Sequence, residues 1–224
     1  LCFDFPVNKI NDNTATLELF HGPTMAFKDV GARFMARCIG YFNEQSPKKV
    51  TVLVATSGDT GGAVASGFLG IEGTEVIILY PKGKVSHIQE LQLTTNSNNI
   101  KAVEVDGVFD DCQEMVKSAF IDADLKGKLN LTSANSINVA RWLPQSLYFF
   151  FACQQFQRMG IDKKLAFSVP SGNFGNICAG IVAKRLGLPV SHFVASTNSN
   201  DTVPRYLQTQ DYLPKLSKQT ISNA

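Results

Sequence analysis

Short apolar segments that alternate with helical patterns limit what this chain can fold into more than any other feature of its sequence. Residues 50–54 form an apolar, β-branched run typical of a buried strand, and comparable runs lie at 75–80, 101–105 and 129–132. Segments with helical spacing separate these runs, and two parallel strands need a crossover of that kind. The alternation therefore predicts an α/β fold in which helices cover parallel sheets.

The character of the sequence changes near Asn138, where we expect a boundary between two units. Residues 143–156 are apolar on almost every side, which predicts a helix that is buried on most of its faces, with Pro144 in its first turn. The other predicted elements are strands at 16–20, 165–169 and 190–195, and helices at 29–41, 60–69, 85–93, 109–121 and 174–186. Ligands of open α/β sheets bind at the carboxyl ends of the strands, so we expect the chemistry in the loops that follow Val54, Thr132 and Val169.

Composition and charge exclude several classes of protein. Hydrophobic residues make up 44% of the chain, which excludes a disordered protein, and the 21 basic and 19 acidic residues form no basic stripe for nucleic acid. Turn residues interrupt the longest uncharged run, 165–183, so no membrane span is expected. Five scattered cysteines without a CxxC pair and three isolated histidines predict a reduced, cytoplasmic protein without a metal site. The chain begins with Leu1 rather than Met, and we expect it to be an excerpt of a longer protein.

The loop after the first buried strand has the composition of an anion site. Ser57, Gly58, Asp59 and Thr60 come directly before a predicted helix that starts with two further glycines. Free backbone N–H groups and the positive end of the helix dipole would bind a carboxylate or a phosphate there. No lysine follows the last glycine, so the loop is not a P-loop. The alternative is an ordinary glycine-rich turn in which Ser57 or Asp59 caps the helix.

Two further segments carry polar groups at similar places. The loop Ser171-Gly172-Asn173-Phe174-Gly175-Asn176 also joins a strand to a helix, and its glycines would let the backbone approach a second anion. Taken alone, it could equally be a tight turn. Residues 135–141 end in Arg141, whose guanidinium suits bidentate binding of phosphate. The alternative there is that Asn138 caps a helix and Arg141 lies along it.

Lys28 is the candidate nucleophile. It follows a turn rich in glycine and proline and comes directly after Ala26 and Phe27. A partly desolvated lysine in such a place can form a Schiff base with a carbonyl compound. The alternative is a surface lysine at the start of a helix, where its charge opposes the helix dipole. His21, in the same turn, is interpreted as a hydrogen-bonded structural histidine.

These four motifs, in this order, resemble the threonine synthase family, which belongs to the pyridoxal-phosphate (PLP) enzymes of fold type II, the tryptophan synthase β-like group. The resemblance rests on His21-Gly22-Pro23-Thr24-Met25-Ala26-Phe27-Lys28-Asp29, on Thr56-Ser57-Gly58-Asp59-Thr60-Gly61, on Asn135-Ser136-Ile137-Asn138 with Arg141, and on the loop 171–176. It spans nearly the whole chain.

The resemblance implies a role for each segment. Lys28 would bind PLP covalently, with Phe27 beside it, and would then move protons. The cofactor phosphate would lie on Ser171, Gly172, Asn173, Phe174, Gly175 and Asn176. Ser57, Gly58, Asp59 and Thr60 would bind the substrate carboxylate, with Asp59 also near the 3′-oxygen of the cofactor. Asn135, Ser136 and Arg141, helped by Thr60, would bind a substrate phosphate, and we expect Arg141 across a domain cleft from the cofactor phosphate.

The resemblance also implies a reaction and a domain arrangement. The reaction would convert O-phospho-L-homoserine and water to L-threonine and phosphate, by γ-elimination followed by addition of water at Cβ. Two three-layer domains with parallel sheets would form, a smaller mobile one from 27–138 and a larger, incomplete one from 1–26 and 139–224. The alternatives are a serine/threonine dehydratase or cysteine synthase, a non-catalytic protein that retains PLP, and a plain nucleotide-binding module. The oligomeric state is not predicted.

Overall fold

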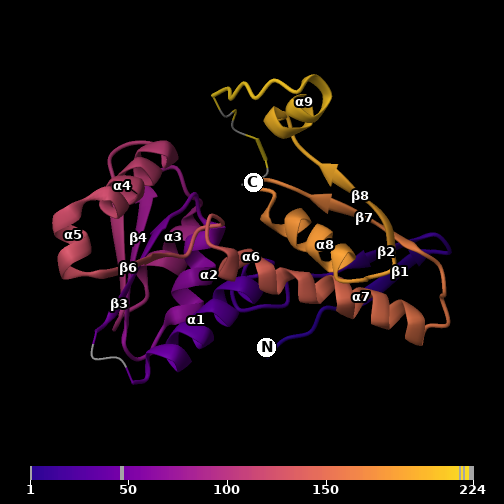
Figure 1. Cartoon of the computed structure of the whole chain (residues 1–224), viewed down its shortest axis with the longest axis horizontal. Helices are drawn as coiled ribbons and strands as arrows, with labels where there is room; N and C mark the ends of the chain where they lie inside the picture. The colour runs from indigo at the N-terminus through magenta and orange to yellow at the C-terminus, as the bar shows by residue number, and fades with distance from the viewer. Residues whose placement is uncertain (1, 46–47, 217, 219, 222–224) are drawn as a thin grey trace.

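Two groups of elements lie next to each other along the long axis of the molecule (Figure 1), in a computed structural model that describes residues 2–45, 48–216, 218 and 220–221. The first group runs from α1 to β6. The second contains α7, α8, β7, β8 and the hairpin β1–β2, and α6 lies between the groups. The first group contains α1 (Asp29–Asn43), β3 (Val50–Ala55), α2 (Asp59–Phe68), β4 (Thr74–Pro81), α3 (His87–Thr94), β5 (Ile100–Val105), α4 (Phe109–Ile121), α5 (Ala123–Lys128) and β6 (Asn130–Ser133). The others are β1 (Val7–Asn11), β2 (Thr14–Leu17), α6 (Val139–Trp142), the 3-10 helix η1 (Leu143–Gln145), α7 (Ser146–Arg158), β7 (Leu165–Pro170), α8 (Gly175–Arg185), β8 (Val190–Ser196) and α9 (Thr202–Thr209).

The first group is built on a four-stranded parallel sheet in the order β5-β4-β3-β6. Alternate side chains of β3 enter two different cores, because successive residues of a strand point to opposite faces. Val52 and Val54 belong to the larger core, whereas Leu53 and Ala55 pack with residues of α4. Both faces of β3 are therefore covered, which explains its uninterrupted run of apolar residues and confirms the prediction of a parallel sheet covered by helices.

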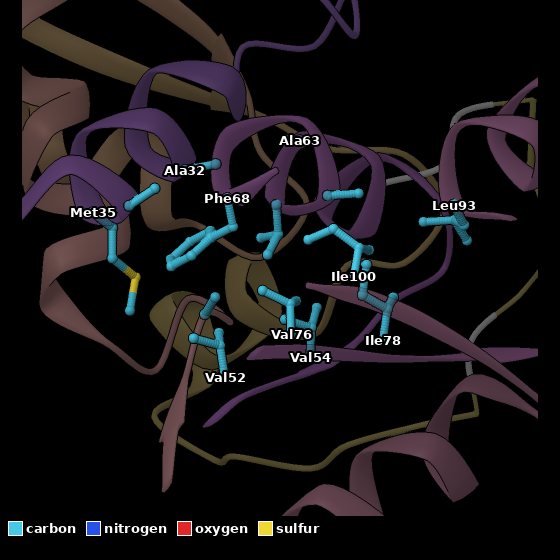
Figure 2. Packing of buried hydrophobic residues seen from close by; sticks show 14 of the residues in the cluster. Ala32, Met35, Val52, Val54, Ala63, Phe68, Val76, Ile78, Leu93 and Ile100 are labelled. Atoms are coloured by element: carbon cyan, nitrogen blue, oxygen red, sulfur yellow. The ribbon is translucent and has the colours of Figure 1, made fainter. Parts of the chain in front are cut away.

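The larger core joins three helices to the sheet. Figure 2 shows its labelled side chains: Ala32, Met35, Ala63, Phe68 and Leu93 from the helices, and Val52, Val54, Val76, Ile78 and Ile100 from the strands. Gly67 of α2 lies against the backbone of α1, since a Cβ at this position would be 3.1 Å from the carbonyl carbon of Ala32. This close approach packs the last turn of α2 against the first turn of α1 and so fixes the two helices relative to each other.

The second group has a separate core around the parallel pair β7-β8. Tyr148 and Phe149 of α7 and Ile177 of α8 pack there with Val169 of β7. Val30 of α1 belongs to the same core. Helix α1 therefore contributes side chains to both groups, two residues after Lys28.

The structure corrects one expectation about the second half of the chain and adds elements that were not predicted. Helix α7 is buried on one face only: Tyr148 and Phe149 are buried, but Leu147 and Phe151 are 40% and 45% exposed, because α8, η1 and the hairpin cover one side of the helix. Strand β1 was missed, and with it the antiparallel hairpin, since β1 is polar and four of its five residues are exposed; β2 overlaps the predicted strand 16–20 at Thr16 and Leu17. Helices α5 and α9 were missed as well. Pro144 lies in η1, directly before α7, as predicted.

Within the described ranges, no helix is both long enough and apolar enough to cross a membrane.

Candidate active site

Lys28 lies immediately before α1, with its side chain only 15% exposed. Its Nζ donates a hydrogen bond to Oδ2 of Asp59 at 3.2 Å and lies 4.9 Å from the centroid of the Phe27 ring. The alternative of a solvent-exposed surface lysine is therefore wrong. Asp59 also compensates the unfavourable position of a cation at a helix N-terminus.

A buried carboxylate fixes the turn that precedes Lys28. The side chain of Asp29 is fully buried, and it accepts hydrogen bonds from the backbone N–H of Thr24 at 2.9 Å and from Oγ1 of Thr24 at 2.7 Å. Gly22 lies directly against this carboxylate, where a Cβ would be 3.0 Å from Cγ of Asp29. The turn is thereby closed back onto the first residue of α1, and the backbone on both sides of Lys28 is held.

The loop at the start of α2 is organised by Thr56, which is 1% exposed. Its Oγ1 accepts hydrogen bonds from the backbone N–H groups of Gly58 at 2.9 Å and Gly61 at 2.8 Å. Neither Ser57 nor Asp59 caps the helix, because the N-cap position is Gly58 and no side chain bonds to it as a cap. In the described part of the chain, the backbone N–H groups of Ser57, Asp59 and Thr60 have no acceptor. These groups can bind a carboxylate, as the composition of the loop predicts.

Asn135 holds the end of β3 instead of facing an open site. Its Oδ1 accepts from the backbone N–H of Ala55 at 3.1 Å, and its Nδ2 donates to the carbonyl oxygen of Ala55 at 2.7 Å. Ala55 directly precedes Thr56, so Asn135 shapes the loop 57–60, which is called the carboxylate loop below. Ser136 is exposed, and its side chain forms no hydrogen bond with the described residues. A contact of either side chain with a substrate phosphate stays a prediction.

Arg141 is buried at the junction of the site segments, with 4% of its surface exposed. Its Nε donates to the carbonyl oxygen of Ala134 at 2.7 Å, and its Nη1 donates to the carbonyl oxygen of Lys28 at 3.2 Å. Burial lowers the pKa of Arg141 to about 10, against the opposing effect of the Asp29 carboxylate. The guanidinium is therefore charged at neutral pH, and it holds the backbone of Lys28 directly.

Gly31 makes this approach possible. A Cβ on Gly31 would overlap the carbonyl oxygen of Arg141 and lie 2.7 Å from Nη1 of Arg141. Helix α1 and helix α6 are therefore packed backbone to backbone at this point. The alternative in which Asn138 caps a helix also holds, since Oδ1 of Asn138 accepts from the backbone N–H of Ala140 at 3.0 Å.

The loop 171–176 leaves a row of backbone donors open. Among the described residues, no acceptor bonds the backbone N–H groups from Gly172 to Asn176, which lie at the N-terminus of the eleven-residue helix α8. The Nδ2 of Asn176 donates to the carbonyl oxygen of Pro170 at 2.7 Å, and Oγ of Ser171 donates to that of Val169 at 3.1 Å. These two side chains fix the loop, and the open N–H groups together with the helix dipole suit a phosphate.

One detail of this loop was not predicted and another differs from expectation. The residue with a left-handed conformation is Phe174, with φ of 60°, and not one of the two glycines. Arg141 was expected across a cleft from the loop, but the segment that carries it lies against the loop. A Cβ on Gly175 would be 3.4 Å from Cβ of Trp142 and 3.7 Å from Cβ of Ser136.

The residues around Lys28 fit PLP. The amine of Lys28 is mostly shielded from solvent and suits the aldehyde of this cofactor. The carboxylate of Asp59 lies within hydrogen-bond distance of that amine and suits the 3′-oxygen. The open N–H groups at the N-terminus of α8 suit the phosphate. His21 bonds through Nε2 to Oε2 of Glu18 at 2.7 Å, in keeping with a structural role. Within the described ranges, no cluster of three or more histidine, cysteine or carboxylate side chains could hold a metal ion.

Sequence reasoning missed Gln89, which is buried and whose Nε2 donates to Oδ1 of Asp59 at 2.7 Å. The sequence carries a local signal for it: Ser86 and Gln89 form the S-x-x-Q pattern of a capping box, which the structure contains at the start of α3. That pattern predicts a helix start and says nothing about a partner thirty residues away.

Known proteins are similar to this chain along nearly its whole length. The family described as "Pyridoxal-phosphate dependent enzyme" matches residues 12–224. The threonine synthase of Haemophilus influenzae is 51% identical over 222 residues, which cover 99% of this chain and 52% of that protein. The chain thus spans about half the length of the curated relatives it matches.

Solved structures of threonine synthases are also similar to this chain. The crystal structure of threonine synthase from Escherichia coli superposes with a TM-score of 0.91 and 51% identity, over 99% of this chain and 51% of that chain. The PLP-bound threonine synthase from Brucella melitensis superposes with a TM-score of 0.86 and 43% identity, over 96% of this chain and 46% of that one.

Proposed function

The chain belongs to the pyridoxal-phosphate-dependent enzymes of fold type II, and from this membership we propose that the protein converts O-phospho-L-homoserine and water to L-threonine and phosphate. The observation that carries the proposal is the similarity to threonine synthases along almost the entire chain. The contact of Lys28 with Asp59, the first residue of α2, supports it.

Lys28 and the loop 171–176 would hold the cofactor. Lys28 would bind its aldehyde carbon, with Phe27 beside the ring, and Asp59 would face its 3′-oxygen. Ser171, Gly172, Asn173, Phe174, Gly175 and Asn176 would hold its phosphate through backbone N–H groups. When bound, PLP acts as an electron sink for carbanions at Cα and Cβ of an amino acid.

The substrate would lie between the carboxylate loop and the segment 135–141. Ser57, Gly58, Asp59 and Thr60 would bind its carboxylate through open N–H groups. Arg141 has five N–H donors, and two of them are engaged with backbone carbonyl groups. The remaining donors, with Ser136 and Thr60, would bind the substrate phosphate, while Asn135 would contribute by shaping the loop.

Lys28 would also move the protons. Its Nζ, held by Asp59, would take a proton from Cα and then one from Cβ of the substrate. It would return one proton to Cγ after the phosphate leaves and one to Cα after the hydroxyl of water adds at Cβ, while the remaining proton of water goes to the phosphate. Closure of a smaller domain, residues 27–138, onto residues 1–26 and 139–224 would exclude bulk water from these steps.

The proposal also includes the compartment in which the protein acts and the kind of partner it binds. We expect a cytoplasmic protein that acts on a small molecule, without nucleic-acid or membrane partners. The five cysteines are scattered along the sequence without a CxxC pair, which supports this expectation.

The test uses the intact protein with PLP and O-phospho-L-homoserine. We expect L-threonine and phosphate in equal amounts. Formation of a 2-oxo acid from L-serine or L-threonine, without release of phosphate from O-phospho-L-homoserine, would favour the dehydratase alternative. Bound PLP without turnover would favour a non-catalytic protein, and absence of PLP binding would favour a nucleotide-binding module.

A further inference from the structure

Gln89 occupies a place in the site that no sequence motif assigns to it. It is 7% exposed and lies in the first turn of α3. Its Oε1 accepts hydrogen bonds from the backbone N–H of Ser86 at 3.1 Å and from Oγ of Ser86 at 3.0 Å. A backbone N–H can only donate, so the amide oxygen must face Ser86 and the amide nitrogen must face the other way.

The amide nitrogen faces Asp59. Nε2 of Gln89 donates to Oδ1 of Asp59 at 2.7 Å, while Nζ of Lys28 donates to Oδ2 of the same carboxylate at 3.2 Å. Each oxygen thus has its own donor, which fixes the plane of the carboxylate. An uninterrupted chain of hydrogen bonds runs from the cap of α3 to the candidate nucleophile.

Gly58 supplies the space for this amide. Its φ is +138°, and a Cβ there would be 2.5 Å from both Nε2 and Oε1 of Gln89. A side chain at position 58 is therefore disfavoured for two reasons: the backbone conformation favours glycine, and the amide of Gln89 fills the space that a Cβ would need. Gln89 touches the backbone of the carboxylate loop as well as the carboxylate of Asp59.

We propose that Gln89 is a positioning residue of the site: its amide orients the carboxylate of Asp59 toward Lys28 and holds the loop 57–60 in the shape that leaves its N–H groups open. This inference rests on the proposed function, since it concerns the same site. The competing explanation is that Gln89 only caps α3.

Two substitutions separate these explanations. Gln89→Glu keeps an acceptor for Ser86, and therefore the capping box, but replaces the Nε2 donor with an oxygen that faces Asp59. Ser86→Ala removes the hydroxyl of the cap but leaves its backbone N–H to orient Gln89, so the bond to Asp59 is kept. The second variant is the matched control for the first.

The experiment titrates each intact, cofactor-free protein with PLP and records the visible spectrum of the bound cofactor and the stability of the free protein. We expect Gln89→Glu to weaken PLP binding by about tenfold or more and to shift the visible band, because a hydrogen bond to a charged group is lost and two carboxylates then face each other. Ser86→Ala should stay within about twofold of the unaltered protein, since the two hydrogen bonds that it loses are neutral and lie outside the site.

Equal PLP affinity and equal spectra for the two variants would overturn the role of Gln89. If Gln89→Glu does not fold, Gln89→Met takes its place: it lacks the donor to Asp59 at similar volume, but also the acceptor for Ser86. It should bind PLP more weakly than Ser86→Ala does, without the repulsion between two carboxylates. Failure of the unaltered protein to bind PLP would instead overturn the proposed function, and the role of Gln89 with it.

Discussion

Substitution of Gly31 by alanine tests the closest backbone contact around Lys28. In a helix interior, alanine is normally the better residue by about 1 kcal/mol. At Gly31, however, the new Cβ would overlap the carbonyl oxygen of Arg141 and lie 2.7 Å from its Nη1. The obstacle is backbone, so α6 must move away from α1, and the bond from Nη1 to the carbonyl oxygen of Lys28 is lost with it.

The expected net effect is destabilisation. Overpacking costs about 1–3 kcal/mol and the lost bond from a charged donor about 1.5–3 kcal/mol, so after the gain in helix propensity we expect Gly31→Ala to lower the free energy of unfolding by about 1.5–5 kcal/mol. Gly127 of α5 is the matched control, because a Cβ there would meet nothing within 4 Å. Gly127→Ala should raise the free energy of unfolding by about 0.5–1 kcal/mol.

The assay is urea-induced unfolding of the cofactor-free intact protein, since bound cofactor would add its own stabilisation. Opposite signs for the two glycines would support the packing described for α1 and α6. If Gly31→Ala is as stable as Gly127→Ala, the two helices do not approach as closely as the structure has them, and the account of how Arg141 holds Lys28 is wrong.

Three other predictions address the core, the thiols and the substrate. Phe68→Ala should lower the free energy of unfolding by about 3–5 kcal/mol in the same urea assay, because Phe68 is fully buried in the larger core; a loss below 1 kcal/mol would contradict that core. Burial raises the pKa of the Cys112 thiol, so little thiolate forms at neutral pH, and Cys112 should react with a disulfide reagent only after unfolding. Mass spectrometry of the labelled peptides measures this reaction, and rapid labelling in the native protein would count against the burial of Cys112. Ser136→Ala should raise KM for O-phospho-L-homoserine by about fivefold or more, while PLP retention and stability stay unchanged. The exposed hydroxyl bonds to no described residue, so the substitution removes only a bond to the substrate phosphate. An unchanged KM in steady-state kinetics would contradict a place for Ser136 in the phosphate site.

Local signals made the parallel sheet and the site loops predictable. A β-branched apolar run such as 50–54 has few alternatives to a buried strand, and glycines with hydroxyls directly after it indicate open N–H groups. Lys28 was predictable for a related reason, since a cation at a helix start is unfavourable without a partner. The structure supplies that partner in Asp59.

Nonlocal side-chain contacts could not be predicted in this way. Gln89 meets Asp59 across thirty residues, and Asn135 meets Ala55 across eighty. The bonds from Arg141 to two backbone carbonyl groups depend on how α6 packs against α1. Phe174 adopts a left-handed conformation that sequence alone would give to a glycine.

The most direct test of the central claim is to locate the covalently bound cofactor. The intact protein is incubated with PLP, reduced with borohydride, digested, and analysed by mass spectrometry. If Lys28 is the nucleophile, the reduced label lies on the peptide that contains Lys28, and the Lys28→Ala protein carries none. A label on any other lysine, with Lys28 unmodified, would contradict the assignment of the site.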